Sequence, residues 1–373
     1  MTKASYYIGI MSGTSADGVD LALVDFSSDK VQLKAHFYQN YNNELNQKIT
    51  ALYSSKQNEI DRMGSLDVEL AHYFYQAIKQ FLAQENLESS DILAIGCHGQ
   101  TIRHRPFINE DIQHPFTLQI GCHQTLACLT NIKVIGDFRT KDIALGGQGA
   151  PLVPAFHQYL FSQRQQDTFI VNMGGIANIT FLPQQANKPV IGFDTGPANA
   201  LLDEWCFKHT GKRYDENGHW ASQGTVNEEL LSALLTDQYF SLPSPKSTGR
   251  EYFNLAWLTP YLANFSLEPI DVQATLSALT AYTIAQQVNK LSPKSFVYLC
   301  GGGINNIHCY KLLKHKLNNH SVDSINSLNL NNNAFEAMAF AWLAFAYDKK
   351  IYGNIPTVTG ASKKTILGIK FYP

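Results

Sequence analysis

The chain has 373 residues, of which 29 are basic and 31 acidic, so its formal net charge is −2. This balance gives no field that favours nucleic acid, and a hydrophobic content of 45% is enough for a core in each of two domains. The composition excludes a disordered chain and a collagen-like repeat. Only 16% of the residues are charged, below the ~25% of an average soluble domain, which weakly favours neutral, hydroxyl-rich ligands.

The N-terminal apolar run is interrupted by Gly9, Ser12 and Gly13, which is not typical of a signal peptide. No window has the ~20 apolar residues of a membrane span. Six cysteines are scattered along the chain, at positions 97, 122, 128, 206, 300 and 309. Scattered cysteines favour reduced thiols over a disulfide framework, so we expect a cytoplasmic protein. From the net charge and the lack of a long apolar window, we expect no nucleic-acid and no membrane partner.

The first half predicts three strands, then a helix with one apolar face and further short strands. The strands span residues 6–11, 19–26, 31–37, 91–96, 116–120 and 132–135, and the helix spans 61–81. After a Gly/Pro-rich stretch the order starts again, with strands over 168–172, 176–182, 189–193 and 296–300, helices over 276–291 and 335–342, and an asparagine-rich loop over 326–333. The repeated order predicts a structural duplication, although sequence identity between the halves is too low to demonstrate it.

Three glycine-rich turns each follow a predicted strand, at residues 9–18, 172–175 and 300–303. Glycine lets backbone amides approach a phosphate closely, and Ser or Thr hydroxyls add donors. None of the turns has the Walker or G-x-G-x-x-G pattern, so ordinary P-loop and Rossmann sites are excluded. Any single turn could be a plain tight turn, but three in a duplicated fold favour a nucleotide accompanied by Mg²⁺.

Several long segments, in this order, resemble the anhydro-N-acetylmuramic acid kinase family, bacterial cell-wall recycling enzymes of the actin, hexokinase and Hsp70 superfamily. The resemblance covers nearly the whole chain. It is carried by GIMSGTSADGVD (9–20), HGQTIRH (98–104), DFRTKD (137–142), GGQGAPLVP (146–154), NMGGIAN (172–178), GFDTGPAN (192–199), KSTGRE (246–251), CGGG (300–303) and EAMAFAW (336–342).

The resemblance implies an α/β protein of two RNase H-like domains, duplicated as in actin-like ATPases, around a cleft that closes on ATP and sugar. We predict a first domain of residues 1–137 with about 360–373, and a second of 138–359. Mg²⁺ is the expected cofactor, and a homodimer is the usual state of such enzymes. The implied ATP-binding residues are Ser12, Gly13, Thr14, Ser15, Ala16, Asp17, Gly18, Val19, Gly174, Gly175, Gly301 and Gly302.

Two positions depart from related sequences. Gly9 stands where many sugar kinases of the superfamily carry an aspartate, which leaves the metal-positioning carboxylate open. Ala198 stands where close relatives commonly have glycine. The second change should be minor unless the backbone φ at residue 198 is positive.

The implied substrate, 1,6-anhydro-N-acetylmuramic acid, has a C1–O6 bond, so O6 is both leaving group and phosphate acceptor. One carboxylate could suffice, because the γ-phosphoryl group captures the departing oxygen. We predict that Asp194, just after the strand 189–193, is the catalytic base, ionised at a reference pKa of ~4. On the residues alone, Asp194 could equally cap the helix that follows.

Glu336 opens an apolar helix, where it could simply favour the helix dipole; the resemblance places it at the active site, orienting water or holding a Mg²⁺-bound water. Arg139 could meet the lactyl carboxylate of the sugar bidentately or form a structural salt bridge with Asp137 or Asp142. The substrate-binding prediction is completed by residues whose donors and acceptors suit sugar hydroxyls: His98, Gln100 and Thr101.

The residues leave three alternative functions open: a zinc site, a plain sugar kinase and an ATP switch. The pairs Cys97-His98 and Cys122-His123 suggest zinc, but neighbours on a strand point to opposite faces, which disfavours a shared metal. A plain sugar kinase of the same fold would phosphorylate a free hydroxyl and hydrolyse nothing. An actin-like ATP switch would hydrolyse ATP with no sugar present, whereas either kinase should wait for its sugar.

Overall fold

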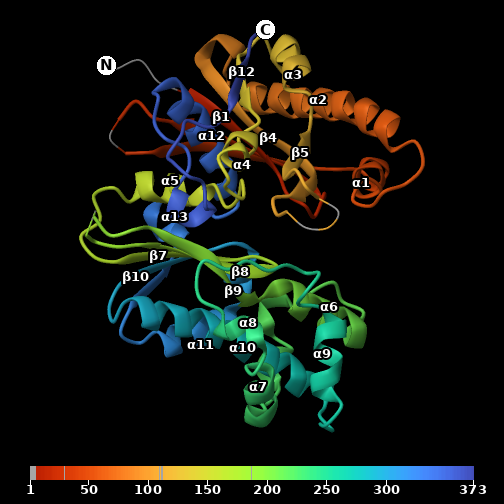
Figure 1. Ribbon diagram of the computed structural model, residues 1–373, viewed down its shortest axis with the longest axis vertical. Coiled ribbons are helices and arrows are strands. Elements are labelled where there is room, and N and C mark those ends of the chain that lie inside the picture. The colour runs from red at the N-terminus through yellow and green to blue at the C-terminus, as the bar shows by residue number, and fades with distance from the viewer. Residues whose placement is uncertain (1–5, 29, 109, 111, 186) are drawn as a thin grey trace. The chain divides into compact units, whose positions relative to one another are not determined.

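The computed structural model describes residues 6–28, 30–108, 110, 112–185 and 187–373 (Figure 1). The chain forms two compact units: unit 1 is Met1–Leu160 with Asn333–Pro373, and unit 2 is Phe161–Asn332. Each unit contains one β-sheet with helices packed on it. The predicted α/β class with two domains is therefore confirmed.

Unit 1 is built on a sheet of order β12-β6-β4-β1-β2-β3, with β5 paired to β4. Its strands are β1 (Tyr6–Ser12), β2 (Gly18–Asp25), β3 (Gln32–Asn40), β4 (Ile92–Arg105), β5 (Phe116–Ile120), β6 (Val134–Gly136) and β12 (Ile369–Phe371). Its helices are α1 (Asn43–Thr50), α2 (Glu59–Gln84), α3 (His123–Thr130), α4 (Thr140–Ala144), α5 (Val153–Leu160), α12 (Phe335–Asp348) and α13 (Pro356–Thr359).

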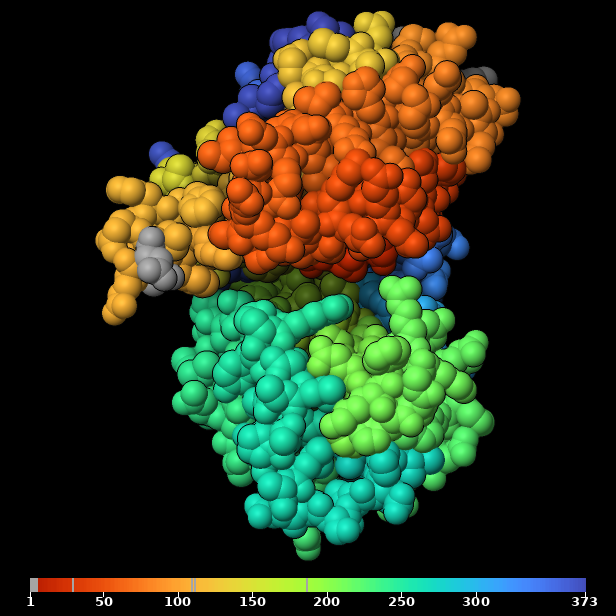
Figure 2. Space-filling view, turned by 90° about the vertical axis from the view of Figure 1, so that its right-hand side faces the viewer, coloured from red at the N-terminus to blue at the C-terminus, as the bar shows by residue number. Residues whose placement is uncertain are grey.

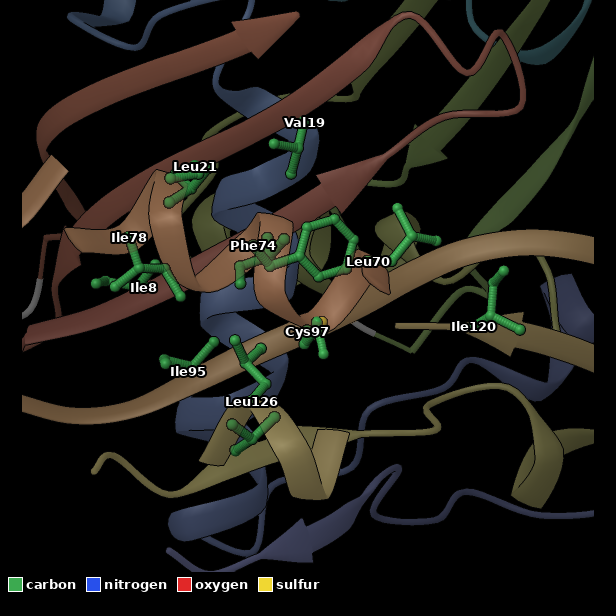
Figure 3. Packing of buried hydrophobic residues seen from close by; sticks show 14 of the residues in the cluster. Ile8, Val19, Leu21, Leu70, Phe74, Ile78, Ile95, Cys97, Ile120 and Leu126 are labelled. Atoms are coloured by element: carbon green, nitrogen blue, oxygen red, sulfur yellow. The ribbon is translucent and has the colours of Figure 1, made fainter. Parts of the chain in front are cut away.

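The sheet of unit 1 is covered on both faces, which follows from the alternation of side chains along β1. Ile8 packs with Phe74 and other apolar residues of α2 (Figure 3), and Ile10 belongs to the same buried cluster. Gly9, between them, faces α12 so closely that a side chain there would collide with the backbone of Ala337. An aspartate could not replace Gly9 without moving this helix, which explains the departure from the wider superfamily.

Unit 2 has a sheet of order β11-β10-β7-β8-β9. Its strands are β7 (Thr168–Met173), β8 (Ile176–Leu182), β9 (Ile191–Pro197), β10 (Phe296–Cys300) and β11 (Ser321–Ser324). Its helices are α6 (Asn199–Thr210), α7 (Glu228–Leu234), α8 (Gln238–Ser241), α9 (Leu255–Leu262), α10 (Pro269–Leu291) and α11 (Ile307–Lys316). Residues 199–262 cover much of the face of unit 2 that Figure 2 shows, in green to turquoise.

The two sheets share one topology. In unit 1, β1, β2 and β3 form an antiparallel meander, β4 runs parallel to β1, and β6 runs parallel to β4. In unit 2, β7, β8, β9, β10 and β11 repeat the same order and directions. This correspondence confirms the predicted duplication of an RNase H-like fold.

The bounds of the units and of some elements differ from the prediction. Residues 138–160 and 333–359 lie in unit 1 rather than with the second domain, because α12 packs on β1, β2 and β4. The strand predicted to end at Gly96 continues to Arg105. The local sequence patterns did not predict several elements, namely α1, α3, α4, α5, α7, α8, α9, α11, α13, β11 and β12. Part of the predicted asparagine-rich loop forms a short 3₁₀ turn, Ile325–Leu328.

Three further expectations concern the cysteines, a membrane-spanning helix and Ala198. All six cysteines are unpaired; Cys128 is exposed, Cys122 is half-buried and the other four are buried. Among the described helices, none is both long and apolar enough to cross a membrane. Ala198 has a φ of −138°, so the alanine is tolerated there as expected.

Candidate active site

The turn between β1 and β2 carries the first set of predicted nucleotide-binding residues. Its polar side chains Thr14, Ser15 and Asp17 are exposed. Ala16 adopts a φ of +51°, an uncommon conformation for a residue other than glycine, and donates its N–H to Gly13 O at 3.1 Å. A side chain at Gly13 would meet only Ser15 Oγ, at 3.7 Å, within 4 Å. The outer side of the turn is therefore polar and open, as a phosphate site requires.

Side chains from other segments of unit 1 fix this turn by hydrogen bonds. Ser12 Oγ hydrogen-bonds Gln100 Oε1 at 2.5 Å, Tyr41 Oη at 2.8 Å and Gly18 O at 3.1 Å. Gln100 Nε2 donates to Gly13 O at 3.0 Å and to Tyr53 Oη at 3.1 Å. Gln100 is fully buried and its amide bonds this turn and Tyr53, so the structure places it behind the turn and does not expose it to a ligand.

Tyr53 adds the last brace. Its hydroxyl donates to Thr14 O at 2.9 Å, and desolvation followed by the charge of Asp17 raises the pKa of Tyr53 to about 12. Val19 lies in the core of unit 1, and Ala16 is also buried. Of the predicted residues 12–19, Ser12, Ala16 and Val19 can therefore offer a nucleotide only their backbone.

His98 and Arg139 form a tight pair in unit 1. Arg139 Nε and Nη2 both donate to His98 Nε2, at 3.0 and 2.9 Å, and His98 Nδ1 donates to Gly99 O at 2.8 Å. Desolvation, with the charge of Arg139, holds the pKa of His98 well below its usual range. His98 is thus a neutral acceptor for Arg139, and neither predicted salt bridge of Arg139 is found among the described contacts.

Thr101 lies farther along β4, where its hydroxyl accepts a hydrogen bond from Gln119 Nε2 at 3.1 Å. Glu336 lies in the first turn of α12, and its side chain is exposed. Surrounding protein atoms and then the charge of Asp20 raise the pKa of Glu336, while Arg139 opposes the rise. Glu336 is therefore an exposed carboxylate that lies near the charges of both Asp20 and Arg139.

Two acidic side chains of unit 1 could help to hold a Mg²⁺ ion that is bound mainly by phosphates and water. No cluster of three or more His, Cys, Asp or Glu that could enclose a metal occurs in the described part of the chain. Mg²⁺ with a nucleotide usually takes only one or two protein carboxylates. Asp20, whose Oδ1 bonds His36 Nε2 at 2.8 Å, and Glu336 offer that number.

Asp194 lies inside β9, not after it, because β9 continues to Pro197. It is not the N-cap of α6, a place taken by Ala198. Its Oδ2 accepts a hydrogen bond from Thr248 N at 2.9 Å, and its carbonyl accepts one from Tyr239 Oη at 2.7 Å. Oδ1 has no hydrogen-bond partner among the described residues, which leaves it available to a ligand.

Burial has a direct effect on Asp194 as a base. Desolvation raises the pKa of Asp194 to about 6; the Thr248 N–H opposes this rise and the charge of Glu251 adds to it. The expected pKa of ~4 was therefore wrong, since an exposed reference value was applied to a largely desolvated group. With a pKa of about 6, Asp194 is still mainly ionised at pH 7 and is a stronger base than an ordinary aspartate.

The predicted glycines of unit 2 lie at the ends of two adjacent parallel strands, β7 and β10. The carbonyls of Gly174 and Gly175 accept hydrogen bonds from the first N–H groups of α6. Gly301, with a φ of +84°, approaches Asn172 so closely that a side chain would collide with its Oδ1. Asn332 accepts from Gly301 N at 2.6 Å. The structure therefore brings both glycine turns together.

A row of polar residues crosses this sheet and was missed by the sequence analysis. Asn172 pairs with Asn178 and Asn178 pairs with Asp194, so the three lie side by side on β7, β8 and β9. Directly paired residues of neighbouring antiparallel strands share a face. The sequence does show these polar residues inside otherwise apolar strands. Only the strand register shows that they are neighbours.

Comparison with known proteins identifies relatives along the full chain. The family described as "Anhydro-N-acetylmuramic acid kinase" matches residues 5–373. A protein of that name from Colwellia psychrerythraea is 51% identical, covering 100% of this chain and 98% of that relative. Namesakes from Shewanella denitrificans and Saccharophagus degradans are each 46% identical, covering 100% of this chain and 99% and 100% of theirs.

Proposed function

This chain belongs to the anhydro-N-acetylmuramic acid kinase family, and on that premise we propose that it converts 1,6-anhydro-N-acetylmuramic acid and ATP into N-acetylmuramic acid 6-phosphate and ADP. Water attacks C1, the C1–O6 bond breaks, and O6 takes the γ-phosphoryl group. Water supplies the new oxygen on C1, and its proton passes to a base. The product would serve recycling of peptidoglycan sugars.

Asp194 is the proposed base. The observation that carries this role is its half-satisfied carboxylate: Oδ2 is fixed by Thr248 N at 2.9 Å, while Oδ1 has no partner among the described residues. A fixed oxygen orients the group, and a free oxygen can accept a proton from water. The raised pKa, about 6, places the base near neutral working pH.

The remaining predicted residues divide between ATP and sugar. We propose that the open side of turn 12–19, together with the two glycine turns of unit 2, binds the phosphates of ATP through backbone N–H groups. Mg²⁺, held by Asp20 or Glu336 beside the phosphates, would neutralise charge as the phosphoryl group moves. Arg139 would bind the lactyl carboxylate, and Thr101 would bind a sugar hydroxyl.

The proposal is tested by giving the purified protein ATP, Mg²⁺ and either the anhydro sugar, free N-acetylmuramic acid or no sugar. ADP should form with the anhydro sugar only, and mass spectrometry should find the 6-phosphate. Equal ADP formation with the free sugar would indicate a plain sugar kinase. ADP formation without sugar would indicate an ATP switch.

Three expectations concerning the whole protein stay predictions. The homodimer would be checked by light scattering of the purified chain, where the monomer mass is 41.6 kDa. The cytoplasmic location would be checked by fractionating cells that express the native gene. Closure around ATP and sugar would be checked by small-angle scattering, which should give a smaller radius of gyration at saturating ligand.

A further inference from the structure

A buried carboxylate in unit 1 has no part in the proposed chemistry. Asp142 in α4 is fully buried. Its Oδ1 accepts hydrogen bonds from Asn354 Nδ2 and Thr359 Oγ1, both at 2.8 Å. Its Oδ2 accepts one from Gly149 N, also at 2.8 Å. Asp142 therefore joins the glycine loop 146–149 to a C-terminal segment of the chain.

Gly149 is the link between Asp142 and the predicted sugar site. It has a φ of +67°, and a side chain there would meet Ile143 Cγ1 at 3.0 Å and Arg139 O at 3.2 Å. Its carbonyl accepts a hydrogen bond from Arg139 Nη1 at 2.8 Å. Gly149 thus donates its N–H to Asp142 and accepts a hydrogen bond from Arg139 at its carbonyl.

The guanidinium of Arg139 is held on two sides. Nε and Nη2 donate to His98, and Nη1 donates to Gly149. A guanidinium has five N–H donors in a planar fork, so one N–H on each of Nη1 and Nη2 has no partner among the described residues. Those two N–H groups are the donors that remain for a ligand carboxylate.

We propose that Asp142 is a positioning residue for the carboxylate end of the sugar: by fixing Gly149, it holds the two remaining N–H donors of Arg139 in the orientation that binds a carboxylate. The inference rests on the proposed function, because it takes the ligand carboxylate to be the lactyl group. Arg139 has a long side chain with many rotamers, and contacts that restrict it in advance reduce the ordering needed on binding. A purely structural Asp142 would instead stabilise the fold and leave ligand preference unchanged.

The test compares two ligands that differ in a single group. Calorimetry with a nonhydrolysable ATP analogue would measure binding of 1,6-anhydro-N-acetylmuramic acid and of its lactyl carboxamide. Hydrogen bonds to charged groups predict that the wild type prefers the carboxylate by ~10–100-fold. In Asp142→Ala this preference should fall to about threefold or less, with affinity for the ATP analogue unchanged.

Thr359→Val is the matched control, since it removes a hydrogen bond on the Oδ1 side of Asp142 and leaves Gly149 in place. It should lower thermal stability and keep the wild-type preference. If Asp142→Ala does not fold, Gly149→Ala decides instead, because it disturbs the link to Arg139 and keeps the Asp142 cluster; it should also lose the preference.

Three results would overturn the inference: a folded Asp142→Ala or Gly149→Ala protein that keeps the preference, an equal loss in Thr359→Val, or a wild type that does not distinguish the two ligands. The last result would also remove the carboxylate role of Arg139. The kinase proposal is judged separately, by sugar-dependent ADP formation, so the two can fail independently.

Discussion

The turn at residues 12–19 of unit 1, the proposed phosphate site, is fixed by hydrogen bonds of Ser12, Tyr41, Tyr53 and Gln100, whereas the Asp194 carboxylate in unit 2 is held by one backbone N–H. The difference fits the two tasks proposed for these residues. A turn that binds phosphate must keep its backbone N–H groups in fixed positions, which hydrogen bonds from behind achieve. A base needs a free oxygen and a pKa near neutrality, and each further donor would lower that pKa.

The largest effect should come from removing the base. Asp194→Asn is nearly isosteric but cannot accept the proton of water, so kcat should fall by ~10²–10⁴-fold while ATP and sugar still bind. Steady-state kinetics and calorimetry would measure both quantities. Asp323→Asn, at an exposed position on β11, is the control and should keep wild-type kcat. A near-normal rate in Asp194→Asn would remove Asp194 from the chemistry.

The next effect concerns the open side of the turn. Gly13→Val should fold, because little surrounds a side chain there, but it should obstruct approach of the phosphates. Lost hydrogen bonds to charged phosphate predict a rise of ~10–100-fold in the Kd for ATP, measured by calorimetry. Gly9→Ala makes the contrast, since it should destabilise the fold through collision with α12. Unchanged ATP affinity in folded Gly13→Val would place the phosphates elsewhere.

The pH dependence follows from the raised pKa of Asp194, about 6. The carboxylate is the active form, so kcat/KM should be level above pH ~7 and fall roughly tenfold for each pH unit below ~5. The charge of Glu251 adds to the rise of this pKa, so Glu251→Gln should move the acidic limb to lower pH. Rates between about pH 4.5 and 8 would check this. A limb near pH 4 in the wild type would show that desolvation does not tune the base.

The smallest effect should come from one brace of the turn. Tyr53→Phe removes the hydroxyl that bonds Thr14 O and Gln100 Nε2, and a net loss of ~1 kcal/mol predicts about a fivefold higher KM for ATP with little change in kcat. Tyr73→Phe is the control, because its hydroxyl bonds Asn40 O rather than the turn. Equal KM values in the two variants would mean that the braces do not hold the phosphate site.

The sequence predicted the fold well wherever a local pattern was enough. Alternating apolar residues located nearly all of the strands, and the repeated order predicted the duplication. Bounds failed where tertiary contacts override local signals. β4 continues past Gly96 because residues 100–105 pair with β5, and α12 joins unit 1 although a long stretch of unit 2 precedes it.

The candidate site was predictable residue by residue but not as an arrangement. The motifs that resemble the family predicted Asp194 and the turn 12–19 as site residues. The row Asn172, Asn178 and Asp194 needs strand register, and the bracing by Tyr53 needs tertiary contacts between residues 39 positions apart. The pKa of Asp194 depends on burial, which a local sequence pattern does not fix.

The central claim is that Asp194 activates water for attack at C1 while O6 takes the phosphoryl group, and labelled water tests it most directly. The reaction in oxygen-18 water should place the label on C1 of N-acetylmuramic acid 6-phosphate and none on its phosphate. The product must be analysed early, before mutarotation exchanges the anomeric oxygen. Unlabelled C1 at early times, or label in the phosphate, would contradict the coupled mechanism.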